Sequence, residues 1–233
     1  MSKVISRGEC PKCGSSDAFT TFTEGPPKCF SCGCVHRERD KMSTYREGYK
    51  EKKVDISLYR SYPIKALKHK PIPVDICQRY GVRVALDEQT GSEITRVYYP
   101  YYDDSNSVVG YKIRTIPKEF HAEGQTSKVK LFGQQLFDDK QRKMLIITEG
   151  EDDALSVATM LQMRGKDYPV VSISSGANTT TVGADIKHNY EYIVSHETVM
   201  LCFDNDKVGQ AYAKIVAEFL CGACTVKIVS LPE

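Results

Sequence analysis

From residue 143 onward, short apolar runs of strand length alternate with longer amphipathic segments of helix length. Buried strands are predicted in KMLIITEG (143–150), PVVSISSG (169–176), VMLCFDND (199–206) and TVKIVSLP (225–232). The segments EDDALSVATMLQMRG (151–165) and KVGQAYAKIVAEFL (207–220) have a helical apolar period. Strands separated by helices at this interval predict an α/β fold with a parallel sheet.

The middle of the chain, residues 55–143, has a weaker pattern that predicts mixed α and β structure. IPVDICQRYGV (72–82) predicts a short helix that ends at Gly81, and TRVYYPYYDDSNSVVGYKIRTI (95–116) predicts a β-hairpin that turns at residues 103–106. Because alternate residues of a strand share a face, Lys112 and Arg114 point the same way and could hold phosphates. A solvated outer face is the alternative for these side chains.

The first 35 residues contain two Cys-x-x-Cys pairs separated by fifteen residues. The pairs are Cys10 with Cys13 and Cys29 with Cys32, and the intervening AFTTFTEG (18–25) predicts a strand of a small antiparallel sheet. Four thiolates at this spacing predict one tetrahedral structural Zn²⁺ site, a zinc ribbon. Disulfide pairing is the alternative, which a reducing compartment disfavours.

The net charge differs among the three parts of the chain that the sequence patterns distinguish. Residues 1–53 carry 11 Lys and Arg against 7 Asp and Glu, residues 54–144 carry 15 against 11, and residues 145–233 carry 6 against 12. A basic front beside an acidic back suits a polyanion that is held by lysines and arginines while the carboxylates bind cations. Solvated surface charge is the alternative. The organisation we predict is a zinc ribbon (1–35), a polar linker (36–54), a basic subdomain (55–143) and a parallel α/β domain (144–233).

No apolar run is long enough to span a membrane, and the N-terminus has no apolar signal region.

Two groups of acids follow predicted strands of the parallel sheet. The first contains Glu149, Glu151, Asp152 and Asp153 in TEGEDDAL, and the second is Asp204 and Asp206 in FDND. The carboxyl ends of parallel strands meet at one edge of the sheet, so the groups are expected to converge there. Clustered carboxylates need a cation, and hard oxygen ligands suit Mg²⁺ or Mn²⁺. Interaction with a helix dipole is the alternative for Asp152 or Asp153.

These residues carry a resemblance to a known family. TEGEDDAL followed by LCFDND resembles the Toprim motif pair of bacterial and phage primases, topoisomerases and some nucleases. With the zinc ribbon, GYKIRTIPKEFHAEG (110–124) and PVVSISSGA (169–177), nearly the whole chain is similar to the primase half of the primase–helicases of short-tailed bacteriophages, which are relatives of the mitochondrial Twinkle helicase.

The resemblance implies a DNA primase, a nucleotidyltransferase that makes short RNA primers on single-stranded DNA. It implies that Glu149, Asp204 and Asp206 are catalytic and hold Mg²⁺ or Mn²⁺, and that Glu151 and Asp153 support them. Positions that it assigns to nucleotide and template are Lys112, Arg114, Lys118 and Lys128. The implied cofactors are therefore structural Zn²⁺ and the catalytic divalent ion.

The resemblance also implies partners and a setting. It implies ribonucleoside triphosphates as substrates, a replicative helicase and a DNA polymerase as partners, and the cytoplasm of a bacterial host as the location. Relatives continue beyond SLPE (230–233) into a helicase, and no Walker A motif occurs here. We therefore expect a fragment or a stand-alone piece that is monomeric. A Toprim nuclease and a non-catalytic DNA-binding module are the alternatives.

Overall fold

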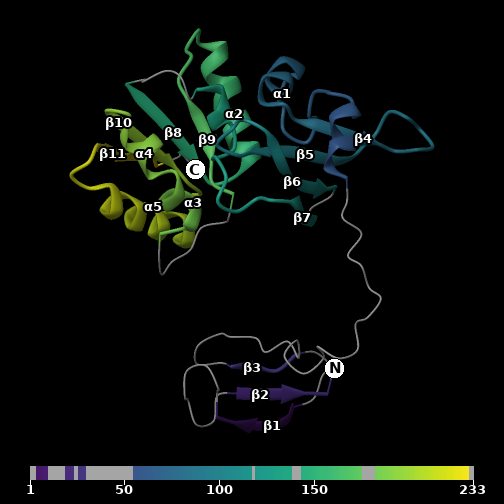
Figure 1. Ribbon diagram of the computed structural model, residues 1–233, viewed down its shortest axis with the longest axis vertical. Coiled ribbons are helices and arrows are strands. Elements are labelled where there is room, and N and C mark those ends of the chain that lie inside the picture. The colour runs from purple at the N-terminus through teal and green to yellow at the C-terminus, as the bar shows by residue number, and fades with distance from the viewer. Residues whose placement is uncertain are drawn as a thin grey trace. The chain divides into compact units, whose positions relative to one another are not determined.

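The computed structural model describes residues 4–9, 19–23, 26–29, 55–116, 119–137, 143–174 and 182–230 (Figure 1). The chain divides into two compact units, Met1–Lys53 and Val54–Glu233, each of which is considered by itself. In these described ranges, no helix is long and apolar enough to cross a membrane.

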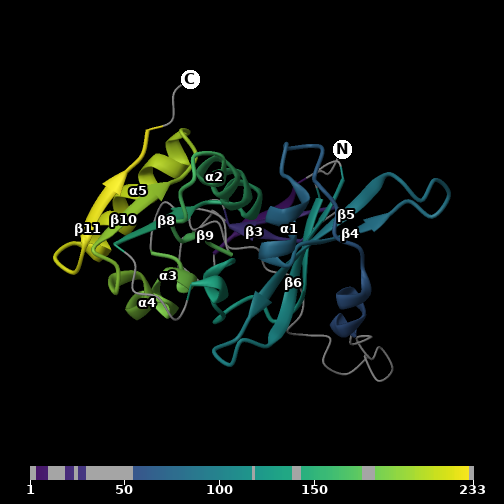
Figure 2. The same ribbon diagram turned by 90° about the horizontal axis from the view of Figure 1, so that it is seen from above.

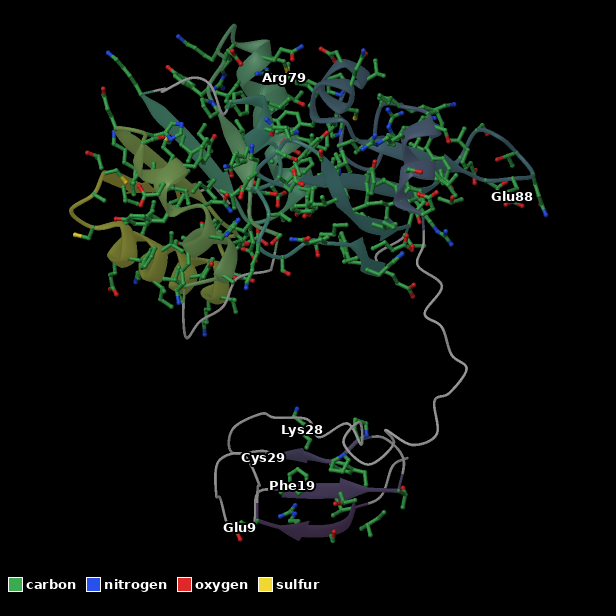
Figure 3. The ribbon with its side chains drawn as sticks, viewed as in Figure 1. Glu9, Phe19, Lys28, Cys29, Arg79 and Glu88 are labelled. Atoms are coloured by element: carbon green, nitrogen blue, oxygen red, sulfur yellow. The ribbon has the colours of Figure 1, made fainter. Side chains whose placement is uncertain are left out.

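The first unit contains a three-stranded antiparallel sheet in the order β1-β2-β3. Its strands are β1 (Val4–Gly8), β2 (Phe19–Phe22) and β3 (Lys28–Cys29). Phe19 pairs with Cys29 across the two strands, and the side chain of Cys29 is buried (Figure 3). The strand predicted in residues 18–25 is therefore observed. Cys10, Cys13 and Cys32 lie outside the described residues, so the zinc site remains a prediction.

The C-terminal part of the second unit is a four-stranded parallel sheet in the order β11-β10-β8-β9 (Figure 1). Its strands are β8 (Met144–Thr148), β9 (Val170–Ser172), β10 (Thr198–Cys202) and β11 (Thr225–Ile228). The helices between them are α2 (Glu151–Met163), α3 (Ala184–His188), α4 (Tyr190–Val194) and α5 (Lys207–Leu220). The mixed α/β fold with a parallel sheet, predicted from the alternation of apolar patterns, is confirmed.

Helices cover both faces of this sheet because its strands are apolar on both sides. On β8, Ile146 packs in the same cluster as Leu155 of α2, whereas Leu145 and Ile147 pack with the residues of α3, α4 and α5. Neighbouring residues of a strand point to opposite faces, so one short apolar run contributes to both layers. This arrangement buries the strands and leaves their carboxyl ends accessible at one edge.

The other half of the second unit is an antiparallel sheet in the order β4-β5-β6-β7, seen beside the parallel sheet in Figure 2. Its strands are β4 (Arg83–Leu86), β5 (Ile94–Tyr102), β6 (Val108–Thr115) and β7 (Glu119–Gly124). The other elements are the 3-10 helices η1 (Ile56–Ser61) and η2 (Gln134–Leu136) and the helix α1 (Val74–Tyr80). The predicted helix ends at Gly81, which has φ +72°, and the predicted hairpin joins β5 to β6.

The two faces of the antiparallel sheet have different neighbours. Tyr98 packs against Tyr59 of η1, with the ring centroids 4.6 Å apart. Its neighbours along β5, Tyr99 and Tyr101, belong instead to the core cluster that includes Leu155 of α2. The second face of the antiparallel sheet is therefore packed against the parallel α/β domain. The hydroxyl groups of Tyr99 and Tyr101 on that face contact acidic side chains at the start of α2.

Candidate active site at the carboxyl edge of the parallel sheet

The two acidic motifs meet where the strand order of the parallel sheet reverses. After β8 the chain crosses to β9 on one side, and it later returns to β10 on the other side of β8. Glu149 follows β8 directly, and its Oε2 accepts a hydrogen bond of 3.3 Å from the backbone N–H of Asp204, which lies just beyond β10. Ligands of open α/β sheets bind at such a switch point. The predicted convergence of Glu149 and Asp204 is therefore observed.

These acids line a pocket of about 600 Å³ between the two sheets. Acidic side chains form one wall and basic and aromatic side chains form the other. The lining residues are Lys70, Tyr99, Lys112, Arg114, Phe120, Glu149, Gly150, Glu151, Asp152, Asp153 and Asp204. The structure thus brings six of the sequence-predicted site residues into one pocket. Asp206 and Lys128 are not among its lining residues, and Lys118 lies outside the described residues.

Glu151 is a buried carboxylate, only 3% exposed. Its Oε1 accepts hydrogen bonds from the hydroxyl of Tyr101 and, at 3.0 Å, from Nζ of Lys112. Burial holds the pKa of Tyr101 well above its usual range, so the hydroxyl stays protonated and donates. The same ammonium of Lys112 donates to the carbonyl of Ser174 at 3.3 Å. Lys112 is therefore fixed between the two sheets at the wall of the pocket.

Asp152 is the hub of a second buried polar network. Its carboxylate accepts a hydrogen bond of 2.6 Å from the hydroxyl of Tyr99, contacts the guanidinium of Arg114 and lies 2.9 Å from Nε2 of His69. Burial by itself raises the pKa of Asp152, but the hydrogen bonds from Tyr99 and His69 and the charge of Arg114 outweigh it and hold that pKa below its ordinary value. Asp152 is thus an ionised anchor for Arg114.

Asp153 and Asp206 are placed differently from these buried acids. Asp153 pairs with Lys70 at 2.5 Å, and both side chains are about two fifths exposed. Asp206 is the N-cap of α5, where its Oδ1 accepts from the backbone N–H groups of Val208 at 2.9 Å and Gly209 at 2.8 Å. Capping occupies one carboxylate oxygen and leaves the other to a ligand.

The donors at this edge fit a magnesium ion that keeps most of its water. Asp204 is exposed at the mouth of the pocket, beside the half-buried Glu149. Within the described residues, no group of three or more His, Cys, Asp and Glu side chains is placed to enclose a metal. Mg²⁺ does not require such a cage, because it retains several waters and takes one or two carboxylates together with substrate phosphates. Glu149 and Asp204, with Asp206 nearby in sequence, match that donor set.

Sequence reasoning missed several residues of the pocket. Lys70 lines the pocket and His69 contacts the pocket residue Asp152; both belong to the basic run KHK (68–70), which ends 79 residues before Glu149 in the chain. Tyr99 and Phe120 gave no separate signal, because aromatic residues in a strand ordinarily belong to a core. Asp152 was predicted as one of the clustered acids, with interaction with the helix dipole as the alternative, and its pairing with Arg114 was not predicted. Only the docking of the antiparallel sheet reveals what these side chains contact.

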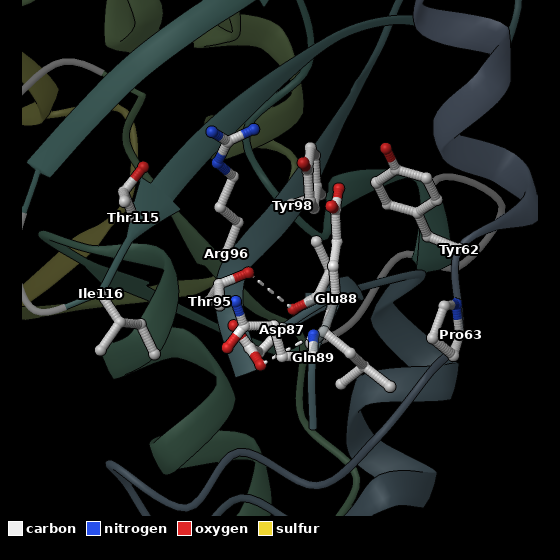
Figure 4. A pocket seen from close by; sticks show the side chains of 13 residues that line it. Tyr62, Pro63, Asp87, Glu88, Gln89, Thr95, Arg96, Tyr98, Thr115 and Ile116 are labelled. Carbon is white, nitrogen blue, oxygen red and sulfur yellow. Dashed lines mark hydrogen bonds between the residues drawn. The ribbon is translucent and has the colours of Figure 1, made fainter. Parts of the chain in front are cut away.

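A second hollow, of about 670 Å³, lies beside β4 and β5 (Figure 4). Arg96 and Tyr98 line it together with Tyr62 and Asp87. None of the thirteen residues around it belongs to the acidic motifs or to the predicted basic positions. The chemistry expected from the sequence therefore lies in the pocket between the two sheets.

Asp206→Ala is expected to destabilise the protein by about 1 kcal/mol, the usual cost of removing an N-cap. Asp206→Asn should retain the free energy of unfolding of the wild type, because asparagine caps helices as well as aspartate does. Urea unfolding of the two variants measures this difference. Equal stability of the alanine and asparagine variants would show that the cap contributes nothing.

Gly209→Ala is expected to displace the loop that carries Asp204. A Cβ at position 209 would lie 2.4 Å from the carbonyl oxygen of Asp204 and 2.9 Å from its nitrogen. Displacement of about 1 Å in a catalytic group can cost about 10²-fold in rate, which is the loss we expect in the metal-dependent activity. Gly8→Ala is the matched control, since a Cβ there meets nothing within 4 Å.

Comparison with known proteins first defines the class of this fold. Residues 146–233 match the Toprim-like family. The fold is also similar to that of the zinc-binding and RNA polymerase domains of the primase of Aquifex aeolicus.

The match to the Aquifex aeolicus primase has 17% identity and a TM-score of 0.54, and it covers 99% of this chain and 75% of that chain. At this identity the likeness supports the fold alone.

Two more similar proteins identify the particular relatives. The chain is 30% identical over 235 residues to a DNA helicase/primase of Enterobacteria phage T3, a match that covers 96% of this chain and 39% of that protein. It is 26% identical to the primase fragment of the bacteriophage T7 primase-helicase, with a TM-score of 0.65 over 99% of this chain and 91% of that fragment. The chain is homologous to the primase part of these phage proteins, as the sequence resemblance predicted, and it spans about two fifths of the length of the T3 protein.

Proposed function

We propose that this protein is a DNA primase that synthesises short RNA primers on single-stranded DNA by metal-dependent nucleotidyl transfer. The observation that carries the proposal is the pocket in which Glu149 and Asp204 face a wall built by Lys112 and Arg114. Phosphoryl transfer requires acids that hold a divalent ion and, opposite them, cations that attract phosphates. Homology to the primase part of phage helicase/primases supports the same reaction.

In this proposal Glu149, Asp204 and Asp206 hold Mg²⁺ or Mn²⁺. When bound, the ion neutralises the charge that develops on the triphosphate and lowers the pKa of the attacking hydroxyl. Glu151 and Asp153 support the site through the lysines they contact, because their carboxylates pair with Lys112 and Lys70. The two lysines are thereby held at the pocket with their charges directed toward incoming phosphates.

The reaction joins the 3′-oxygen of one ribonucleotide to the α-phosphorus of the next and releases pyrophosphate. Glu149, half-buried beside the exposed Asp204, is placed to accept the proton that leaves the hydroxyl. Lys112 and Arg114 stabilise the negative charge on the phosphates, and their buried anchors keep them in position before substrate arrives. Lys118 and Lys128 are proposed to contact the nucleotide or the template farther from the reacting atoms.

The first unit is proposed to bind Zn²⁺ through Cys10, Cys13, Cys29 and Cys32 and to contribute to template recognition. Such a small sheet has too little core to fold without a metal, and Cys29 is buried in it. We also propose single-stranded DNA, a replicative helicase and a DNA polymerase as partners, and a monomer as the state of this chain. The bacterial host cytoplasm is the proposed location.

The proposal is tested by incubating the protein with labelled ribonucleoside triphosphates, a single-stranded DNA library with a second label, and Mg²⁺ or Mn²⁺. Both labels are followed on one gel. Short RNA products that require the divalent ion and the DNA are expected. Shortened DNA without RNA would contradict the proposal and indicate a nuclease, and DNA binding without either product would indicate a non-catalytic module.

A further inference from the structure

One aromatic side chain is exposed in the middle of this charged pocket. Phe120 lies on β7, the edge strand of the antiparallel sheet, directly opposite Arg114 of β6. It is 48% exposed and lines the pocket with Glu149 and Asp204. Single exposed apolar side chains are ordinary on a protein surface, so the feature that distinguishes Phe120 is its place among the charged residues of the pocket.

The neighbouring aromatic residues of the sheet are buried, which separates Phe120 from an ordinary core position. Tyr98, Tyr99, Tyr101 and Tyr111 are each at most 2% exposed. Tyr99 also lines the pocket, but its hydroxyl is committed to Asp152. Phe120 therefore offers a ring face to the pocket, which these four tyrosines do not.

Two cations fix the surroundings of this ring. Nζ of Lys112 lies 5.6 Å from the ring centroid and Cζ of Arg114 lies 5.7 Å from it, both within the range of cation–π attraction. Each cation is in turn anchored by a buried acid, Lys112 by Glu151 and Arg114 by Asp152. A flat apolar surface is thus held beside two groups that attract phosphates.

A nucleotide combines the two chemistries that this arrangement recognises, a planar base and an anionic phosphate. We propose that Phe120 is a stacking platform for a nucleobase, which places the phosphates of the same or the adjoining nucleotide toward Lys112 and Arg114. The inference rests on the proposed function in that the pocket takes nucleotides. The base belongs either to an incoming ribonucleotide or to the DNA template, and the experiment below separates these sources.

The sequence contains no tryptophan, so Phe120→Trp creates a single fluorescent reporter at the proposed platform. The variant is titrated, with Mg²⁺ present, with a ribonucleoside triphosphate, with a short single-stranded oligodeoxynucleotide and with inorganic tripolyphosphate. Stacking predicts saturable quenching by at least one of the first two ligands and much weaker quenching by tripolyphosphate, which has no base. The quenching ligand identifies the source of the base.

Phe219→Trp is the matched control. Phe219 is also exposed, at 38%, but it lies on α5 with its ring 5.5 Å from that of Tyr190 and does not line the pocket. No ligand should quench it by a saturable process. Equal quenching of both variants, equal quenching by tripolyphosphate, or no quenching at position 120 by either base-containing ligand would overturn the inference.

A kinetic experiment gives an independent reading. Phe120→Leu should raise the KM for the ribonucleotide or the Kd for DNA by about 5- to 150-fold, the loss expected for one base–aromatic stack, while Phe120→Tyr should stay near the wild type. Unchanged KM and Kd in the leucine variant would contradict stacking. Because quenching is measured without turnover, a protein that binds bases but makes no primer would sink the primase proposal and leave this inference intact.

Discussion

Replacing Asp204 by alanine is expected to abolish primer synthesis while sparing the binding of single-stranded DNA. Asp204 is exposed at the carboxyl edge of the sheet, so the substitution removes a ligand of the proposed metal without creating a cavity. Losing one strong electrostatic contribution to the transition state costs on the order of 10³-fold in rate. Primer yield and DNA affinity are measured on the same preparation.

Asp104→Ala is the control for this experiment. Asp104 is an exposed aspartate in the turn between β5 and β6, and it does not line the pocket. Its replacement should change neither primer synthesis nor DNA binding. Retained synthesis in Asp204→Ala would contradict the metal assignment at that residue.

Asp152→Ala is expected to lower the free energy of unfolding by about 3 kcal/mol or more. The substitution leaves the guanidinium of Arg114 in a largely buried place without its anion, and the hydroxyl of Tyr99 without its acceptor. Breaking a buried pair by removing one partner costs about 3–5 kcal/mol, because the remaining charge is not solvated. Urea unfolding followed by circular dichroism measures the change.

Asp153→Ala provides a comparison within the same helical turn. Its pair with Lys70 is about two fifths exposed on both sides, so its loss should cost only about 0–1 kcal/mol. Asp152→Asn should fall between the two alanine variants, since the amide oxygen can still accept from Tyr99. Similar costs at positions 152 and 153 would show that burial of the Arg114 pair does not determine stability here.

The meeting of the acidic motifs could be predicted because it follows from local pattern and topology. Short apolar runs separated by amphipathic helices specify parallel strands, and parallel strands bring Glu149 and Asp204 to one edge. The shared face of Lys112 and Arg114 follows in the same way from strand alternation. Neither step requires knowledge of how distant elements pack.

The separate environments of three consecutive acids could not be predicted from the sequence. Successive residues of a helix point about 100° apart, so Glu151, Asp152 and Asp153 face different surroundings at the start of α2. The antiparallel sheet provides the partners of Glu151 and Asp152, 38 to 53 positions earlier in the chain, whereas the partner of Asp153 precedes that sheet and lies 83 positions earlier. Glu151 meets Lys112, Asp152 meets Arg114, and Asp153 meets Lys70 at the margin of the pocket.

By itself the sequence determined the elements, the parallel sheet and the edge at which Glu149 and Asp204 gather, because these depend on periodicity and chain order. The tertiary structure decided which charges are buried in pairs and which remain open to a ligand, and it placed Phe120 beside the cations of β6. Those outcomes depend on docking one sheet against another, and the free energy of each charge depends on the partners and solvent that docking leaves around it.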